Sequence, residues 1–315
     1  MHGPILCTGV MPYDEFGLFH ENAAEYDLPY PGPPDVRRVD VEVEPGRKVS
    51  SLVWGTQGTE PELVLVHGGA QNAHTWDTVA LALGRPLIAI DLPGHGHSDG
   101  GPNGSISVRT NGEDLAAVIR ELAPNATGVV GMSLGGLSTI ALTTAAPELV
   151  RALALIDVTP GISKEASAPI TNFINGPESF PNFDELLTRT VEHNPGRSES
   201  SLRRGILHNA LQREDGSWVW RYARFRSTES AQAQAQSQQP DFGNLWDDVS
   251  NIKVPLLLVR GLAWSVVEDA NLEELHRRQP GVKVIGVEGA GHSIQGDRPL
   301  ELADILEDFF FAGRD

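Results

Sequence analysis

Cysteine, positive charge and long apolar runs are all scarce in this chain. Cys7 is the only cysteine, so no disulfide can form within the chain, and we expect a reducing compartment, the cytoplasm. Lysine and arginine together number 24 against 42 acidic residues, a formal net charge of -18, which argues against nucleic acid or an anionic membrane surface as a partner. The sequence shows neither a signal-peptide pattern nor an apolar run long enough to span a membrane, so we expect no membrane insertion.

The chain is long enough for one large hydrophobic core. It has 315 residues, of which 40% are hydrophobic. We predict an N-terminal extension over residues 1–35, a core over 36–160 and 249–315, and an insertion over 161–248. The extension is rich in proline and glycine, and its aromatic side chains Tyr13, Phe16 and Phe19 are expected to pack on the core.

Apolar strands and helices alternate through most of the chain. Residues 36–43 and 49–54 have β-branched or alternating character around Glu44-Pro45-Gly46, which predicts a hairpin. Short apolar runs and amphipathic stretches then follow one another, which is typical of a mostly parallel sheet covered on both faces. The further strands are predicted at 63–66, 87–90, 129–130, 153–157, 254–261 and 282–287, and helices at 76–83, 107–122 and 299–311. The sequence therefore predicts an α/β fold with an eight-stranded sheet.

One serine lies at a sharp turn between a strand and a helix. Gly131-Met132-Ser133-Leu134-Gly135 follows the apolar run that ends at Val130 and precedes a run of small residues. Flanking glycines allow a backbone bend that holds a serine hydroxyl above the sheet, ready to attack a carbonyl carbon. The pentapeptide alone also fits a plain turn, so its meaning depends on the rest of the chain.

Four motifs in order carry a resemblance. His67-Gly68-Gly69 follows one strand, Asp91-Leu92-Pro93-Gly94-His95-Gly96-His97-Ser98 follows the next, the Ser133 turn comes third, and Gly289-Ala290-Gly291-His292-Ser293 lies near the end. Together they resemble the α/β-hydrolase fold family over residues 36 to 311. The resemblance implies the α/β-hydrolase fold, in which the sheet carries a helical cap insertion.

The resemblance implies a role for several of these residues. Ser133 would be the nucleophile and His292 the base that takes its proton. The backbone N–H groups of Gly69 and Leu134 would form the oxyanion hole. His67 is interpreted as structural under its loop.

Two further histidines lie near the expected pocket. His95 and His97 would shape a turn or line the pocket, and a catalytic role for either is disfavoured. The spacing of the histidines and carboxylates indicates no metal site, and no cofactor is expected.

The acid that should orient His292 departs from the commoner family pattern. The two positions after the strand 254–261 that usually carry it hold Trp264 and Val266. Asp157 is the candidate we favour, because it ends the strand after the nucleophile and some members of the fold place the acid there. Glu268 and Asp269 are the alternatives, although acids also fit the first turn of the helix that follows. An unpartnered histidine is the third possibility.

The predicted cap differs from the core in composition. Helices are expected at 183–192 and 198–212, followed by an aromatic and basic piece at 218–226. We interpret that row mainly as cap core, with one or two rings facing the substrate. The glutamine and alanine run at 231–239 fits either a helix or a mobile loop. The residues expected to line the substrate pocket are Gly68, Met132, Trp218, Trp220 and Trp264.

These observations predict a serine hydrolase that cleaves a carboxylic ester or lactone of a small to medium hydrophobic substrate through an acyl-enzyme. The same residues could serve cleavage of a carbon–carbon bond in a β-diketone or vinylogous substrate, or a perhydrolase reaction. A ligand receptor that keeps the fold without turnover is the alternative outside enzymology. The expected partner is the small-molecule substrate, and a homodimer is compatible with this interpretation.

Overall fold

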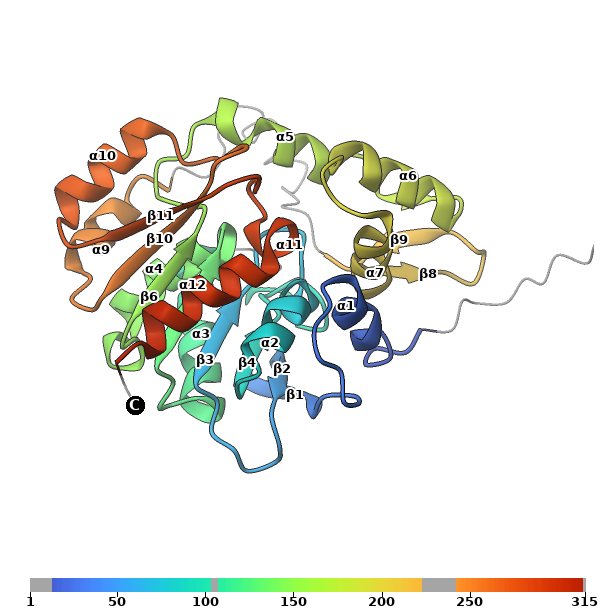
Figure 1. The fold of residues 1–315 in the computed structure, drawn as a ribbon, viewed down its shortest axis with the longest axis horizontal. Helices are drawn as coiled ribbons and strands as arrows, with labels where there is room; N and C mark the ends of the chain where they lie inside the picture. The colour runs from blue at the N-terminus through green and yellow to red at the C-terminus, as the bar shows by residue number, and fades with distance from the viewer. Residues whose placement is uncertain (1–12, 103–106, 223–241, 314–315) are drawn as a thin grey trace, which may run out of the picture.

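The computed structural model describes residues 13–102, 107–222 and 242–313. Its centre is a sheet of eight strands in the order β1-β2-β4-β3-β5-β6-β10-β11 (Figure 1). The strands are β1 (Val36–Glu44), β2 (Arg47–Trp54), β3 (Leu63–Val66), β4 (Leu87–Ile90), β5 (Gly128–Met132), β6 (Leu153–Ile156), β10 (Leu256–Gly261) and β11 (Lys283–Val287). The number of strands is the one that the sequence predicts.

The sheet is antiparallel at one edge and parallel elsewhere. β1 pairs with β2, and β2 with β4, in antiparallel register, while the other five pairings are parallel. The central strands β3, β4 and β6 are buried along their whole length, which explains why they are short continuous apolar runs in the sequence. Because parallel strands share a direction, the loops after β3, β4, β5, β6, β10 and β11 emerge at one edge, where the four motifs meet.

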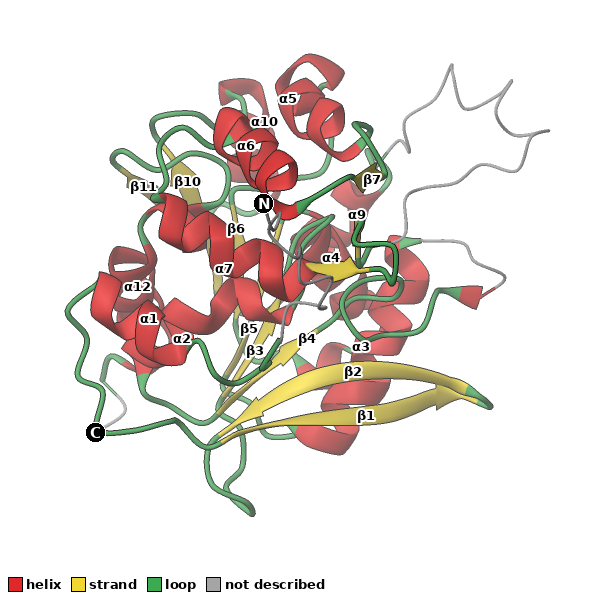
Figure 2. Ribbon diagram, turned by 90° about the vertical axis from the view of Figure 1, so that its right-hand side faces the viewer, coloured by secondary structure: helices red, strands yellow, loops and turns green. Residues whose placement is uncertain are grey.

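Helices cover both faces of this sheet (Figures 1 and 2). Side chains alternate along β3: Val64 and Val66 belong to one apolar cluster, Leu63 and Leu65 to the other. Each fully buried side chain of this kind stabilises the fold by roughly 1.5 to 3 kcal/mol. The helices over the first cluster are α3 (Val108–Leu122), α4 (Leu134–Ala145), α9 (Leu245–Asn251) and α10 (Asp269–Arg278); those over the second are α1 (Phe19–Glu25), α2 (Asp77–Leu83), α11 (Ile294–Asp297) and α12 (Pro299–Phe311).

The insertion after β6 forms a cap with its own small core. It contains α5 (Lys164–Ile174), α6 (Phe183–His193), α7 (Glu199–Asn209) and a three-stranded sheet of β7 (Ser179–Phe180), β9 (Trp218–Trp220) and β8 (Ala210–Gln212). The helix predicted over 198–212 is therefore wrong at its end, because residues 210–212 pair with β9 across a turn in which Gly216 has φ 86°. The run at 231–239 lies outside the described residues.

From residue 13 onward the N-terminal segment packs on the core, as expected, and it contains a short helix. Residues Phe19–Glu25 form α1. The Phe19 ring is 1% exposed and meets the Trp54 ring edge to face, with 5.0 Å between centroids. The Tyr13 hydroxyl lies 2.7 Å from Nδ1 of His208 at the end of α7, so the segment contacts the core and the cap.

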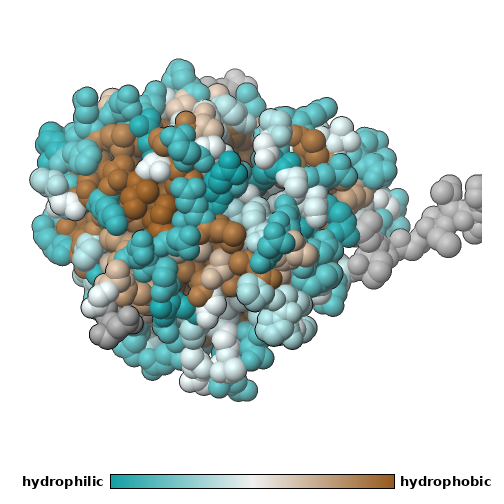
Figure 3. Space-filling view, in the orientation of Figure 1, coloured by the Kyte–Doolittle hydropathy of each residue, from teal (hydrophilic) through white to brown (hydrophobic). Residues whose placement is uncertain are grey.

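The surface mixes polar and apolar side chains. Figure 3 shows apolar surface over the β10 and β11 end of the sheet, where Leu262 is 48% exposed beside Gly286 of the edge strand. Through the described parts of the chain, every helix is too short or too polar to cross a bilayer.

Candidate active site

Ser133 occupies a strained turn between β5 and α4. Its backbone has φ 50° and ψ -120°, a region that side chains other than glycine rarely adopt. The N–H group of Ser133 donates to the carbonyl of Ile156 in β6 at 3.3 Å, and its carbonyl accepts from Leu137 in α4 at 3.0 Å. The turn is therefore held from both sides, and the hydroxyl makes no hydrogen bond to the described residues.

The glycine after this turn is required by close backbone packing. A Cβ atom at Gly135 would lie 2.4 Å from the carbonyl oxygen of His67 and 2.5 Å from that of Val66. Both neighbours are backbone of β3 and the loop that follows it, so neither can move aside cheaply. Gly135 thus lets α4 start directly against the loop that carries Gly68 and Gly69.

Asp157 and His292 meet at the ends of β6 and β11. Nδ1 of His292 lies 2.9 Å from Oδ2 of Asp157. The Asp157 side chain is fully buried and that of His292 is 6% exposed. Nε2 of His292 is buried and has no hydrogen-bond partner within the described structure, which leaves it available to accept a proton.

The loop after β10 supplies the remaining hydrogen bonds of Asp157. Oδ1 accepts from the N–H of Gly261 at 3.0 Å and from the Ser265 hydroxyl at 2.5 Å, and Oδ2 accepts from the N–H of Val266 at 3.2 Å. Three donors besides His292 therefore satisfy the oxygens of this buried side chain. Asp157 has φ 47°, a value that aspartate and asparagine tolerate better than most residues.

The alternative acids are exposed, and their hydrogen bonds and ion pairs are to residues other than His292. Glu268 is exposed and directly precedes α10, and its N–H donates to the Asn271 side chain at 3.0 Å. The Asp269 side chain is 88% exposed and pairs with Arg260 at 3.0 Å. Both acids sit at the start of a helix, where negative charge is favourable.

The loop after β3 carries one of the two expected oxyanion donors. The Gly68 carbonyl accepts from Nδ1 of His67 at 2.7 Å and from the N–H of Gln71 at 3.3 Å. Because the C=O and N–H groups of a trans peptide point in opposite directions, these bonds also orient the N–H of Gly69. Neither the Gly69 N–H nor the Leu134 N–H has an acceptor among the described residues, so both are free to bind an oxyanion.

His67 is a buried neutral side chain in this arrangement. Its Nε2 accepts from the N–H of Leu92 at 2.9 Å, and burial lowers its pKa. The structure therefore places His67 where the sequence analysis expected it, beneath the loop and with both ring nitrogens occupied.

The expected pocket residues fall into different places. The Trp264 ring is 39% exposed and meets the His292 ring edge to face at 5.9 Å. Trp220 stacks on Tyr222 at 5.6 Å, and Tyr222 stacks on His95 at 6.4 Å. Trp218 is 4% exposed and belongs to the cap core, where its ring meets that of Phe183 edge to face at 5.1 Å.

The other two expected lining residues lie close to Ser133. Met132 is 1% exposed in the core cluster. A Cβ atom at Gly68 would lie 2.5 Å from the Met132 sulfur and 3.1 Å from Cβ of Ser133, so the loop passes directly over the nucleophile turn.

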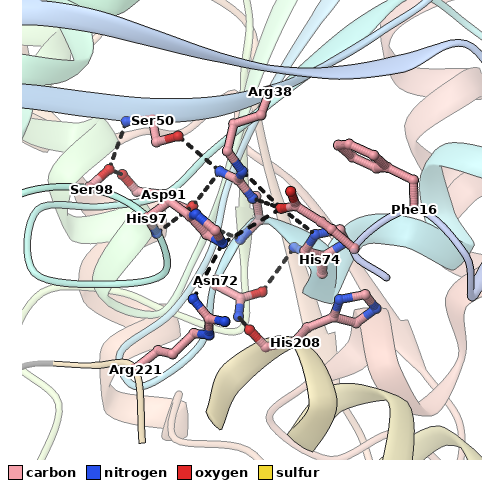
Figure 4. Close-up of polar contacts among 12 residues, drawn as sticks. Phe16, Arg38, Ser50, Asn72, His74, Asp91, His97, Ser98, His208 and Arg221 are labelled. Carbon is pink, nitrogen blue, oxygen red and sulfur yellow. Dashed lines mark hydrogen bonds and ion pairs between the residues drawn. The ribbon is translucent and has the colours of Figure 1, made fainter. Parts of the chain in front are cut away.

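The motif after β4 supports the same loop from below. Asp91 is fully buried, and its carboxylate accepts from the N–H groups of Ala73 at 2.6 Å and His97 at 3.0 Å and from Arg38 at 2.8 Å (Figure 4). His95 accepts from the N–H of Ala70 through Nε2 at 3.1 Å. His95 therefore shapes a turn, one of the two roles expected for it.

A buried ionic cluster beside this loop was missed by the sequence analysis. His74, Asp77 and His208 offer ligand atoms within 4.8 Å of one another, and Glu15 reaches Nε2 of His74 at 3.2 Å. The His74 and His208 rings stack with centroids 3.8 Å apart. The nitrogen lone pairs of two stacked rings lie in two parallel planes, so they do not converge on one metal ion. Both nitrogens of His74 contact carboxylates, and the arrangement therefore fits a charged histidine better than a metal site.

The pKa values agree with that interpretation. Burial lowers the pKa of His74, but the Asp77 and Glu15 carboxylates outweigh it and raise the pKa to about 9. Burial, followed by the charge on His74, lowers the pKa of His208. Residues so far apart in sequence offer no local signal for such a cluster.

Comparison with known proteins assigns the chain to a family. A model described as the alpha/beta hydrolase family matches residues 63–305. The esterase Rv0045c of Mycobacterium tuberculosis is 43% identical over 303 residues, which cover 93% of this chain and 94% of that protein. The chain belongs to the alpha/beta hydrolase family. A solved structure of the mycobacterial esterase aligns with a TM-score of 0.81 at 42% identity, covering 94% of this chain and 98% of that one.

A more distant relative matches most of the chain as well. The 2-(acetamidomethylene)succinate hydrolase of Mesorhizobium japonicum is 28% identical over 266 residues, 84% of this chain and 90% of that protein. The family, the fold and the class of ester-cleaving hydrolase expected from the sequence are confirmed. The roles of individual residues stay predictions.

Proposed function

We propose that this chain hydrolyses a carboxylic ester or lactone of a small to medium hydrophobic molecule. Ser133 attacks the carbonyl carbon while Nε2 of His292 takes the hydroxyl proton, and Asp157 holds the imidazole and stabilises its charge. The observation that carries the proposal is the 2.9 Å contact of Nδ1 of His292 with a fully buried Asp157, which leaves Nε2 without a partner in the described structure.

The oxyanion is the second requirement of this chemistry. The tetrahedral intermediate places negative charge on the former carbonyl oxygen, and the N–H groups of Gly69 and Leu134 have no other acceptor in the described structure. The leaving alcohol takes the proton back from His292, and water then attacks the acyl-enzyme with His292 again as the base. No step needs a metal or a cofactor.

A neutral substrate fits the charge and surroundings of the site. The chain carries a net charge of -18, which disfavours a polyanionic substrate. Trp264, beside His292, offers an aromatic surface for an apolar acyl or alcohol group.

The test is a substrate series with a covalent probe. Purified protein should be labelled by a fluorophosphonate at Ser133 and should cleave p-nitrophenyl esters, with rates compared over increasing acyl length and against a panel of small lactones. Ser133→Ala should abolish both labelling and turnover. Cleavage of a β-diketone without cleavage of any ester would favour the carbon–carbon reaction, and labelling without turnover of any substrate would favour a receptor.

A further inference from the structure

The oxyanion loop contains a strained alanine. The N–H of Gln71 bonds the carbonyl of Gly68 at 3.3 Å and closes a tight turn in which Ala70 has φ 60°. A turn with positive φ at its third position normally has glycine there, since a Cβ atom is disfavoured in that conformation. Three of the four described non-glycine residues with positive φ are Ala70, Ser133 and Asp157, so strain concentrates at this site.

Both polar backbone groups of Ala70 are held from outside the turn. Its N–H donates to Nε2 of His95 at 3.1 Å, and its carbonyl accepts from Nδ2 of Asn209 at 2.7 Å. His95 can accept because its Nδ1 lies 3.1 Å from the Pro93 carbonyl, which leaves the proton on Nδ1. The core therefore fixes one side of the Ala70 unit, and Asn209 fixes the other.

Asn209 belongs to the cap rather than to the core. It is the last residue of α7, and its carbonyl accepts from the N–H of Arg221 at 2.8 Å. Asn72 of the core donates through Nδ2 to the carbonyl of His208 at 2.9 Å and to Oδ1 of Asn209 at 3.3 Å. Figure 4 shows Asn72 facing His208 at this junction. Hydrogen bonds thus run from the core to the cap and from the cap to the loop. The bonds from Asn72 and Arg221 hold Asn209 where its side chain can donate to the Ala70 carbonyl.

We propose that Asn209 is a positioning residue through which the cap holds the oxyanion loop in its active conformation. This inference rests on the proposed esterase function. Asn209 bonds the loop and has no role in the proton transfers. Without its bond to the Ala70 carbonyl, the strained turn relaxes and the adjacent N–H of Gly69 leaves the position that an oxyanion needs. A strained backbone persists only where its surroundings hold it, and here one of the two hydrogen bonds that reach Ala70 from outside the turn comes from the insertion.

The test compares two substitutions at this position with a matched control. Asn209→Ala removes the side chain, and Asn209→Asp keeps its shape but removes the N–H donor. Asn194→Ala is the control, because its Nδ2 also donates to a carbonyl within the cap, that of Thr190 at 2.8 Å, without any bond to the loop. We expect kcat to fall about 10- to 100-fold in both Asn209 variants, with KM changed less than about twofold, because a displaced oxyanion donor acts on the transition state alone.

A second readout separates positioning from general damage to the fold. A trifluoromethyl ketone forms an oxyanion adduct with the serine, whereas the alcohol product binds without one. The affinity for the trifluoromethyl ketone should fall in the Asn209 variants by about the same factor as kcat. The affinity for the alcohol product should stay near that of the Asn194→Ala control, and so should the thermal midpoint of the Asn209→Asp variant. Equal loss of both affinities would overturn the inference, as would full activity in a folded Asn209→Asp variant. Wild-type protein without ester cleavage or probe labelling would instead refute the proposed function.

Discussion

Asp157→Asn tests the orienting acid most sharply, because the structure says what each orientation of the new amide would face. Asparagine is tolerated at the φ of 47° that Asp157 adopts, so the backbone should not change. One carboxylate oxygen becomes an NH₂ group, which cannot accept a hydrogen bond. If it replaces Oδ2, it faces Nδ1 of His292 and the N–H of Val266; if it replaces Oδ1, it faces the N–H of Gly261 and the Ser265 hydroxyl.

Each orientation leaves one backbone N–H without an acceptor, so the two should have comparable free energies. With the amide nitrogen facing His292, Nδ1 must accept and the proton moves to Nε2, the wrong tautomer for a base. With the other orientation, the tautomer is right but the negative charge that stabilises the imidazolium is lost. We therefore expect kcat to fall by about 10³ to 10⁴, which is about 4 to 5.5 kcal/mol of activation free energy. The unpaired N–H should also cost about 1 to 3 kcal/mol of stability.

The assay is steady-state hydrolysis of a p-nitrophenyl ester by purified variants, with urea unfolding to measure stability. Glu268→Gln and Asp269→Asn are the controls, and each should lose less than about tenfold in kcat, since a charge at a helix start contributes about 0.3 to 1 kcal/mol. An Asp157→Asn enzyme within tenfold of the wild type, beside an Asp269→Asn or Glu268→Gln enzyme that loses about 10³, would refute the assignment of Asp157.

Three other changes test separate parts of the structure. Ser133→Ala and His292→Ala should each lower kcat by about 10⁴ or more, and the double variant should be no worse than either single one because the two residues act as a unit; steady-state kinetics of all three variants checks this. Gly135→Ala should destabilise the fold by about 3 kcal/mol or more in urea unfolding, since its Cβ would lie 2.4 Å from a backbone oxygen. The charged His74 stabilises the fold fully below pH 6.5, and this stabilisation should be lost as the pH rises through about 9. The charged Glu15 stabilises the fold fully above pH 4.5, and this stabilisation should be lost as the pH falls through about 2. Thermal midpoints measured across this pH range should vary less in Glu15→Gln than in the wild type.

Most of the sheet and its covering helices could be predicted from local pattern. The strand 63–66 has the predicted bounds because it consists of four apolar side chains, all of them buried. The helix 299–311 has the predicted bounds because Pro299 marks its first turn and Gly313 follows just after its end. The end of α7 could not be placed by helical periodicity. Residues 210–212 pair with Trp218–Trp220, and such pairing is a tertiary contact that overrides local helix preference.

The candidate site could be predicted from the sequence only where a polar residue comes shortly after a predicted strand. Ser133, His292 and Asp157 follow strands and could be singled out. The sequence offers no sign that Asn209 of the cap reaches Ala70, or that Glu15 reaches His74, because these contacts join residues 139 and 59 positions apart. Such long-range contacts depend on how the cap and the N-terminal segment dock.

The hydrogen bonds of the loop after β10 support the proposal that Asp157, which follows β6, is the orienting acid. In the commoner pattern that loop carries a carboxylate, whereas here it contributes hydrogen-bond donors, the N–H groups of Gly261 and Val266 and the Ser265 hydroxyl, all directed at Asp157. A buried carboxylate needs such donors, and a second carboxylate in the same loop would repel it. With Asp157 as the proposed orienting acid, a further acid at the position of Trp264 or Val266 would set two negative charges against one histidine.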